Sequence, residues 1–524
     1  MGDKMKSEAD KLAASRARVR QMGGGERVRK QHDRGKLTVR ERLDLLFDPG
    51  TFIETGILGS EFGTRELVPA DGCVTGYGKV DGRWAGVAAY DFTVKGGSIG
   101  ITSEMKVARI RALALQMGFP MVWLIDSGGA RIDTSAGGFG GPGATRFADS
   151  GYLFKEESLM SGVVPLVAAM MGPGFAGTAY IPGLSDFIPM VKGRSSMGLA
   201  GPALVKMVTG EDLTEDALGG SKVHCEVSGV GDLEVEDDPA CIRAVREYLS
   251  YFPSNNRELP PRAPWSGDPK ALMGDEILNV LPDSARTAYD MHRVVNLIVD
   301  EGKTFEIKPK WGRSVITSLG RVGGYSVGII ASNPMFYAGA IDINAADKAA
   351  RFIWLCDAFN IPLLFLSDVP GFMVGSKAEQ SGIIRHGAKL VHAVSEATVP
   401  KMSIIIRKCY GAAYYAMCGR AYDPDLLLAW PGAEISVMGP EGMVAIFARD
   451  KLAQAKSKEE AAKTVDMLAE AIRPHIRAER AAAAGYVDDV IDPRETRSRL
   501  IACLEFTREK KVVRHPRKHG VYPV

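Results

Sequence analysis

The 524-residue sequence lacks the patterns that mark several common classes of protein. Its seven cysteines are scattered and form no CxxC pair, which disfavours a disulfide framework or a structural zinc site and favours a reducing, cytoplasmic compartment. The net charge is only +2, so nucleic acid is not an expected partner. HExxH and Walker sequences are absent, and no His-Cys cluster has the spacing of a metal site.

One long stretch, residues 158–185, carries no charge and is long enough to raise the question of a membrane span. Several prolines and glycines interrupt it, so we expect a buried strand followed by an active-site loop and no continuous spanning helix. The N-terminus also lacks the apolar segment of a secretory signal. The sequence therefore predicts a globular protein without a membrane partner.

A strand-to-loop unit of the same build occurs twice in the chain. The segment IPLLFLSDVPGF (residues 361–372) predicts a buried parallel strand that ends in a loop, and MVWLIDSGG (residues 121–129) has the same pattern. Residues recur at a fixed offset of 242 positions, where Gly82, Gly86, Pro120, Asp126 and Gly129 correspond to Gly324, Gly328, Pro362, Asp368 and Gly371. We predict two copies of one domain, residues 1–265 and 266–524, divided in the proline-rich stretch 252–270.

Each predicted copy also contains a turn of small residues that opens a helix. The turn lies within residues 172–180 in the first copy and within residues 407–415 in the second. Backbone N–H groups at the start of a helix have no partner inside it, so two of them can point at one oxygen. Such preorganised donors stabilise negative charge that develops on an oxygen. The sequence predicts one oxyanion hole per copy and a reaction that needs no side-chain acid or base.

Several residues near these units have more than one interpretation. Arg131 can pair with a phosphate or carboxylate, or it can brace the loop after the first strand. His386 is the only histidine close to a site stretch, and a structural role is favoured over that of a general base. Cys409 fits a small buried residue better than a nucleophile. Residues 1–48 predict a charged helical arm that packs on a neighbouring subunit.

Longer motifs carry a resemblance to one family. They are DSGGARI at 126, GEDLTEDALGG at 210, SGIIRHGAKL at 381, EATVPK at 396, RKCYGAAYYAM at 407 and AWPGAEISVMG at 429. The chain resembles, over almost its whole length, the carboxyltransferase (beta) subunit of biotin-dependent acyl-CoA carboxylases, nearest the propionyl-CoA type. The resemblance implies an α/β fold of two tandem crotonase-like (ClpP/crotonase) domains related by internal duplication. It also implies transfer of a carboxyl group from carboxybiotin to the α-carbon, or vinylogous carbon, of a short, propionyl-CoA-like thioester.

The resemblance further implies which residues form the site. The N-terminal domain would bind acyl-CoA and the C-terminal one biotin, with the site between domains of different subunits. The amides of Ala176 and Gly177 would hold the enolate oxygen, and those of Ala412 and Ala413 the biotin ureido oxygen. The substrate-binding residues carried over by motif are Gly128, Gly129, Ala130, Arg131, Gly371, Phe372, Tyr414 and Tyr415. No metal is implied in this chain.

Partners are implied in the same way. The sequence has no ATP-grasp region and no convincing biotinylation site, so the biotin carboxylase and the biotin carboxyl carrier (alpha) subunit are expected on another chain or domain. The family also implies self-association into a homohexameric core.

The sequence departs from the family pattern at three places. Both turns contain alanine where paired glycines are usual, residues 133–141 replace a Gln-Glu-Gly continuation, and Tyr415 stands where propionyl-CoA relatives usually have a smaller residue. The acyl group and the direction of the reaction are therefore left open. A soluble carboxyltransferase subunit of a biotin-dependent acyl-CoA decarboxylase is one alternative. A catalytically silent assembly subunit is another.

Overall fold

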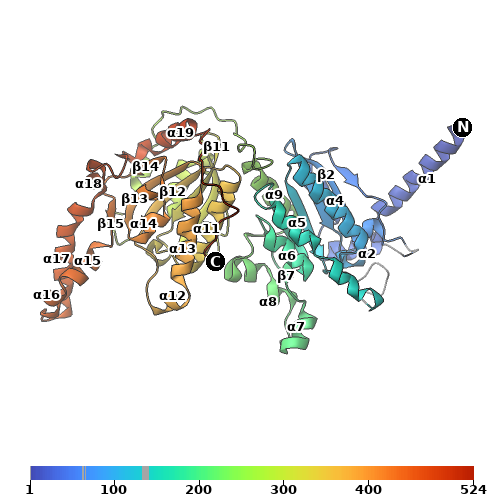
Figure 1. Cartoon of the computed structure of the whole chain (residues 1–524), viewed down its shortest axis with the longest axis horizontal. Helices are drawn as coiled ribbons and strands as arrows, with labels where there is room; N and C mark the ends of the chain where they lie inside the picture. Colours follow the sequence, from blue (N-terminus) through green and yellow to red (C-terminus); the bar gives the residue numbers. More distant parts are fainter. Residues whose placement is uncertain (1, 62–63, 65–66, 133–140) are drawn as a thin grey trace. The chain divides into compact units, whose positions relative to one another are not determined.

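The computed structural model describes residues 2–61, 64, 67–132 and 141–524. Most of the segment 133–141, where the sequence departs from the family pattern, lies outside these ranges. The chain divides into two compact units, Met1–Glu258 and Leu259–Val524, within the proline-rich stretch and slightly before the predicted division at 265/266 (Figure 1). Among the described residues, no helix has the length and apolar character needed to cross a membrane.

The first unit is built on an eight-stranded sheet with the order β1-β2-β3-β4-β5-β6-β8, in which β7 also pairs with β5. The pairs from β1 to β3 are antiparallel and those from β3 onward are parallel. The strands are β1 (Ile53–Thr55), β2 (Cys73–Val80), β3 (Arg83–Tyr90), β4 (Met121–Ser127), β5 (Leu166–Phe175), β6 (Pro189–Val191), β7 (Ser196–Gly198) and β8 (Leu233–Val235).

Helices connect and cover these strands. They are α1 (Gly2–Arg20), α2 (Gly24–Asp33), α3 (Val39–Leu46), α4 (Ile101–Met117), α5 (Tyr152–Met160), α6 (Gly177–Leu184), α7 (Pro202–Thr209), α8 (Glu215–Gly219) and α9 (Asp238–Tyr251). Helix α4 leads from β3 to β4 and ends at Gly118, whose φ of 71° is the left-handed conformation that glycine adopts without steric cost. Its residues Val107, Ile110 and Ala114 are buried in the same apolar cluster as Trp123 of β4.

The second unit repeats the arrangement. Its eight-stranded sheet has the order β16-β14-β13-β12-β11-β10-β9, and β15 also pairs with β13. The strands are β9 (Thr304–Glu306), β10 (Val315–Val322), β11 (Tyr325–Ser332), β12 (Leu363–Val369), β13 (Lys401–Tyr410), β14 (Leu426–Ala429), β15 (Glu434–Ser436) and β16 (Asp489–Val490). The helices are α10 (Met291–Ile298), α11 (Ile343–Ala358), α12 (Ser376–Gln380), α13 (Ile383–Glu396), α14 (Ala412–Ala416), α15 (Pro440–Phe447), α16 (Arg449–Ala453), α17 (Lys458–Ile476), α18 (Ala478–Ala483) and α19 (Thr496–Phe506).

The internal duplication extends to individual hydrogen bonds. The Gly86 N–H donates to the Pro120 carbonyl oxygen at 2.9 Å, and at the same place in the second unit the Gly328 N–H donates to the Pro362 carbonyl oxygen at 2.8 Å. Strand register agrees as well, because Gly86 and Gly328 each pair with the first residue of the following strand. The prediction of two tandem α/β domains related by duplication is confirmed.

The uncharged stretch 158–185 forms a buried strand, as the sequence predicts. Every residue of β5 is buried, and the chain then turns into α6. Strands β4 and β12 are likewise buried along their whole length, which is typical of parallel strands covered on both faces. The carboxyl ends of these buried strands hold the candidate site.

Candidate active site

The turn in the second unit joins the end of β13 to α14. At the junction Gly411 has φ 58° and ψ −146°, a conformation that favours glycine. Its N–H donates to the Ser436 carbonyl oxygen at 2.9 Å and so extends the pairing of β13 with β15. The next two N–H groups, of Ala412 and Ala413, have no acceptor among the described residues. Since Ala413 is fully buried and orphaned buried N–H groups are rare, these amides are available to a ligand oxygen.

The corresponding turn in the first unit joins β5 to α6 and corrects one prediction. Ala176 has a positive φ of 54°, and its N–H donates to the Gly198 carbonyl oxygen at 3.0 Å. The Ala176 amide is therefore engaged in strand pairing and does not face a ligand. The amides with no acceptor among the described residues are those of Gly177 and Thr178, and Thr178 is fully buried.

An offset in the sequence also relates these two amides to the pair in the second turn. The match of 164–165 with 399–400 gives an offset of 235 positions. Applied to the turns, this offset pairs Gly177 and Thr178 with the two alanines that open α14, and Ala176 with Gly411. The positive φ values of Ala176 and Gly411 agree with that correspondence. The two turns therefore present equivalent pairs of amides.

The glycine loop after β4 lies against the first turn. The Gly129 carbonyl oxygen accepts from the Ile99 N–H at 2.8 Å, and a Cβ on Gly129 would lie 2.7 Å from the Phe175 carbonyl oxygen. Only glycine allows so close an approach between the loop and the end of β5. Gly128 is exposed and Ala130 is half-buried, so this loop borders the space that the turn faces.

The loop after β12 has the same position in the second unit. The Gly371 carbonyl oxygen accepts from the Ile341 N–H at 3.1 Å, as Gly129 does from Ile99 in the first unit. Gly371 has a φ of 144°, and no described atom lies within 4 Å of the place that a Cβ would occupy, which leaves the loop surface open. The Phe372 ring packs on Gly387 at the start of α13.

Arg131, which the resemblance implies as a substrate-binding residue, makes bracing contacts within the first unit. The side chain is buried, with 3% exposed. Its Nη1 donates to Asp71 and Glu61, at 2.5 and 3.3 Å, and its Nη2 donates to the Ser98 carbonyl oxygen at 3.0 Å. With its donors directed at these groups, the guanidinium ties together loops that are distant in sequence.

The two tyrosines of α14 differ in exposure. Tyr414 is half-buried, and its hydroxyl accepts from the Arg420 N–H at 3.1 Å. Tyr415 is 47% exposed and lines a cavity of about 550 Å³ together with Ser395 and Tyr422. Of the two side chains, Tyr415 is therefore the more exposed.

Other side chains near the site have structural roles. His386 Nδ1 lies 2.8 Å from Asp347 Oδ1 and links α13 to α11. The Cys409 thiol is buried, and burial raises its pKa to about 12, so it is not a nucleophile. Behind the strand ends, Asp126 and Asp368 are fully buried carboxylates paired with cations, and burial raises the pKa of Asp368. The described residues contain no cluster of metal-ligating side chains.

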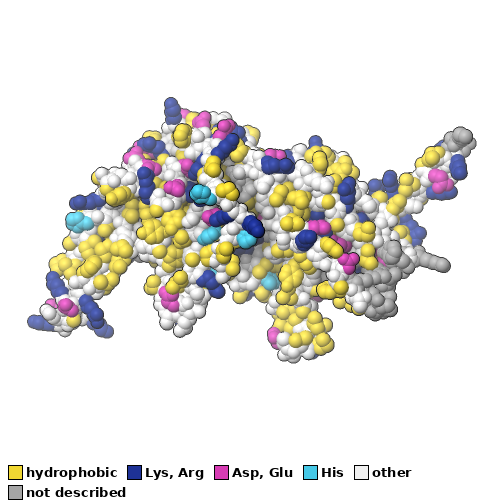
Figure 2. Space-filling model, viewed as in Figure 1, with side chains coloured by type: hydrophobic (Ala, Val, Ile, Leu, Met, Phe, Trp, Pro, Cys, Tyr) yellow, Lys and Arg dark blue, Asp and Glu magenta, His cyan; other side chains and the backbone are white. Residues whose placement is uncertain are grey.

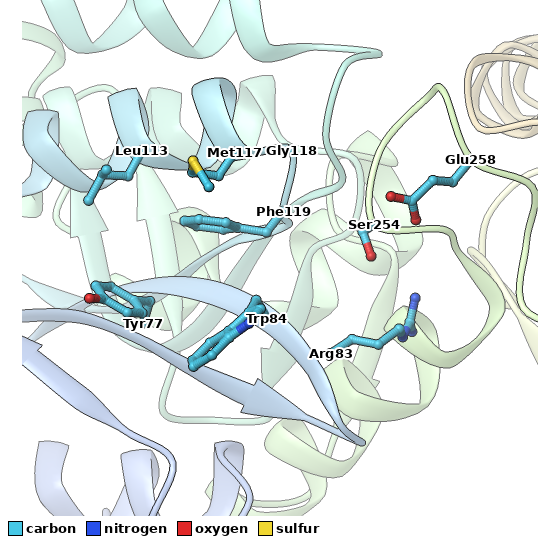
Figure 3. Close-up of a pocket in the computed structure, with 9 residues that line it drawn as sticks. All are labelled: Tyr77, Arg83, Trp84, Leu113, Met117, Gly118, Phe119, Ser254 and Glu258. Carbon is cyan, nitrogen blue, oxygen red and sulfur yellow. The ribbon is translucent and has the colours of Figure 1, made fainter.

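The first unit also has a cavity, which lies away from its turn. It measures about 560 Å³ and lies at the opposite ends of β3 and β4, where Arg83 begins one strand and Phe119 precedes the other (Figure 3). Tyr77 and Trp84 of the β2–β3 hairpin face Leu113 of α4 across it. This cavity is separate from the candidate site.

Pairs of main-chain amides such as these can stabilise negative charge on an oxygen. The chain belongs to the carboxyl transferase domain family, which it matches over residues 30–522. It is 42% identical over 526 residues to the propionyl-CoA carboxylase carboxyltransferase subunit of Haloferax mediterranei, covering 99% of this chain and 100% of that protein. It is 44% identical over 514 residues to the methylmalonyl-CoA decarboxylase subunit alpha of Veillonella parvula, covering 97% of each.

A solved structure agrees with this assignment. The crystal structure of transcarboxylase 12S with methylmalonyl-coenzyme A bound matches with a TM-score of 0.92 and 40% identity, covering 99% of this chain and 98% of that one. The family resemblance and the crotonase-like fold predicted from the sequence are both confirmed.

Proposed function

We propose that this chain is the carboxyltransferase subunit of a biotin-dependent enzyme that moves a carboxyl group between carboxybiotin and the α-carbon of a short acyl-CoA. A propionyl-CoA-like substrate fits the relatives named for propionyl-CoA and methylmalonyl-CoA. The observation that carries the chemistry is the pair of turns, each with two N–H groups that have no acceptor among the described residues. No side-chain acid or base is needed in such a site.

In the first unit, the Gly177 and Thr178 amides would donate to the thioester oxygen. The α-proton would pass to biotin, and the two fixed donors would stabilise the negative charge that this leaves on the thioester oxygen. Removing one such donor typically costs a factor of about 10² to 10³ in kcat. Gly128, Gly129 and Ala130 border the same space and would lie along the thioester.

In the second unit, the Ala412 and Ala413 amides would donate to the ureido oxygen of biotin. When bound, biotin supplies a carboxyl group carried on a ring nitrogen. The two amides would stabilise negative charge on that oxygen. Gly371 and Phe372 would border the ring, while Tyr414 and Tyr415 would limit the space open to the acyl group.

Exposed apolar helices support self-association into a hexameric core. Helix α7 has no buried residue, and its Met207 and Val208 are 76% and 71% exposed. Its counterpart α15 exposes Ile446 and Phe447. Figure 2 shows hydrophobic side chains gathered over both helices. Apolar patches of this kind mark protein interfaces. Transcarboxylase 12S, similar over 99% of this chain, is described as a hexamer assembly in a multienzyme core.

The biotin-carrying partner would be a separate alpha subunit that holds the biotin carboxylase and carrier functions. A decarboxylase subunit is the second candidate, because relatives named methylmalonyl-CoA decarboxylase subunit alpha are 44% and 43% identical. The same turns serve transfer in either direction. A catalytically silent role is disfavoured, since both turns keep paired donor amides despite their alanines.

The test is to incubate the purified chain with methylmalonyl-CoA and free biotin and to measure the formation of propionyl-CoA. We expect turnover that increases with biotin concentration and is lost when biotin is omitted. Malonyl-CoA serves as a second substrate in case the acyl preference differs. A lack of biotin-dependent turnover with both thioesters would contradict the proposal.

A further inference from the structure

We propose that Tyr410, Glu434 and Arg473 form a positioning network that holds the second-unit turn in place for the biotin ureido oxygen. The first-unit turn forms without such a network. This inference rests on the proposed function of the second turn.

The network lies directly behind the turn. Tyr410 is the last residue of β13, is 6% exposed, and donates its hydroxyl hydrogen to Glu434 Oε2. Arg473 Nη1 donates to the other carboxylate oxygen of Glu434 at 2.8 Å, and its Nη2 donates to Glu441 at 2.8 Å. Burial and the bond to Glu434 raise the pKa of Tyr410, so the hydroxyl stays protonated as a donor.

These contacts fix the turn from three elements. Glu434 begins β15, whose last residue, Ser436, accepts the Gly411 N–H. Strand β15 thus holds both the backbone of the turn and the Tyr410 side chain that precedes it. Arg473 ties β15 to α17, and Glu441 extends the contact to α15. Four hydrogen-bonded groups therefore restrict the direction in which the Ala412 N–H points.

The first unit provides an internal comparison. The offset of 235 positions relates Phe175 to Tyr410. Strand register relates Ser196 to Glu434, because their strand partners Pro173 and Lys408 are 235 positions apart. Phenylalanine has no hydroxyl, and the buried Ser196 Oγ has no partner among the described residues. The fold therefore makes this turn without the network.

A physical argument connects the difference to function. Charged groups removed from water lose hydration, so partly buried ion pairs are not an efficient source of stability. Their fixed geometry is valuable where a donor must be placed accurately, because a misplacement of about 1 Å can cost about 10²-fold in rate. The network lies behind the second-unit turn, which would bind biotin carried on a separate chain. We infer that it sets the affinity for biotin more than the affinity for acyl-CoA.

The test varies free biotin and methylmalonyl-CoA separately in the biotin-dependent assay. Tyr410→Phe should lower kcat/KM for biotin about tenfold, the effect of losing one hydrogen bond to a charged group, and change kcat/KM for methylmalonyl-CoA less than about twofold. Arg473→Met should produce the same split, and the conservative Arg473→Lys should retain most of the wild-type value. Tyr90→Phe, which removes a buried hydroxyl from the first unit, is the control and should match the wild type.

Three results would overturn the inference. One is an unchanged kcat/KM for biotin in both Tyr410→Phe and Arg473→Met. Another is an equal loss for both substrates, which would indicate a purely structural role. The third is additive losses in the double variant, because two members of one network should lose little more together than the worse one alone. Wild-type protein without biotin-dependent turnover would instead overturn the proposed function itself, and this inference with it.

Discussion

Replacing Asp126 by asparagine should destabilise the first unit strongly. Asp126 is fully buried and accepts hydrogen bonds from Lys36 at 2.6 Å, Gln31 at 3.0 Å and Arg42 at 3.1 Å. Arg42 is itself buried and donates to Asp238 at 2.7 Å. Two cations thus face two carboxylates. Asparagine at position 126 leaves one positive charge buried without a counter-ion. Its side-chain NH2 group would also face hydrogen-bond donors in place of a carboxylate oxygen.

The expected loss is about 3 to 5 kcal/mol, the usual cost of removing one partner from a buried ion pair. Domains are stable by only about 5 to 15 kcal/mol, so this is a large share for the unit. Asp368→Asn in the second unit is the matched control. There the carboxylate accepts from Arg407 at 2.9 Å, and burial already raises the pKa of Asp368. We expect its loss to be smaller, about 1 to 3 kcal/mol.

Urea unfolding followed by hydrogen exchange measures the stability of each unit in the same sample. In Asp126→Asn, peptides from β4 should lose protection at lower urea concentration than in the wild type, while peptides from β12 should not change. Adding Lys36→Met to Asp126→Asn removes the unpaired cation and should restore more than half of the loss. Wild-type protection of β4 in the single variant, or no recovery in the double variant, would refute the reasoning.

Two further predictions concern the second unit. The hydrogen bond to Glu306 raises the pKa of His292 to about 9 in the folded protein. Protonated His292 therefore stabilises the fold fully below the unfolded pKa of about 6.5, and this stabilisation is lost as the pH rises through about 9. Because the side chain is 37% exposed, solvent screening should reduce this stabilisation to about 1 kcal/mol. We expect the melting temperature of the wild type to fall as the pH is raised, and that of His292→Gln not to show this fall. Identical pH profiles of the two proteins would contradict this. Tyr415→Asp should enlarge the cavity beside α14 and raise the kcat/KM ratio of methylmalonyl-CoA to malonyl-CoA about tenfold. An unchanged ratio would place the acyl pocket elsewhere.

The duplicated sheet can be predicted because the recurring residues are fixed by local geometry. Pro120 and Pro362 precede buried strands, and Gly86 and Gly328 lie where the neighbouring strand begins. Runs of apolar residues between prolines and glycines then define the strands themselves. These local patterns are enough to predict the domain class and the approximate position of each turn.

The finer features depend on contacts that no local pattern encodes. The Ala176 N–H is predicted to face a ligand, and the sequence does not show that the Gly198 carbonyl oxygen accepts it. The partners of Arg131 are equally hidden, since Asp71 and Glu61 lie at least 60 residues away in the chain. The network behind Tyr410 likewise joins residues from separate elements.

The most direct test of the central claim removes one donor N–H from the second turn. Proline at Ala412 deletes the amide hydrogen at the first helical position, where proline is well tolerated, and the residue before it is glycine. Glu215→Pro makes the same change at the exposed start of α8 and is the matched control. In the assay with free biotin and methylmalonyl-CoA, Ala412→Pro should lower kcat/KM by a factor of about 10² to 10³, while Glu215→Pro keeps the wild-type value. Wild-type activity in a folded Ala412→Pro variant would contradict the account.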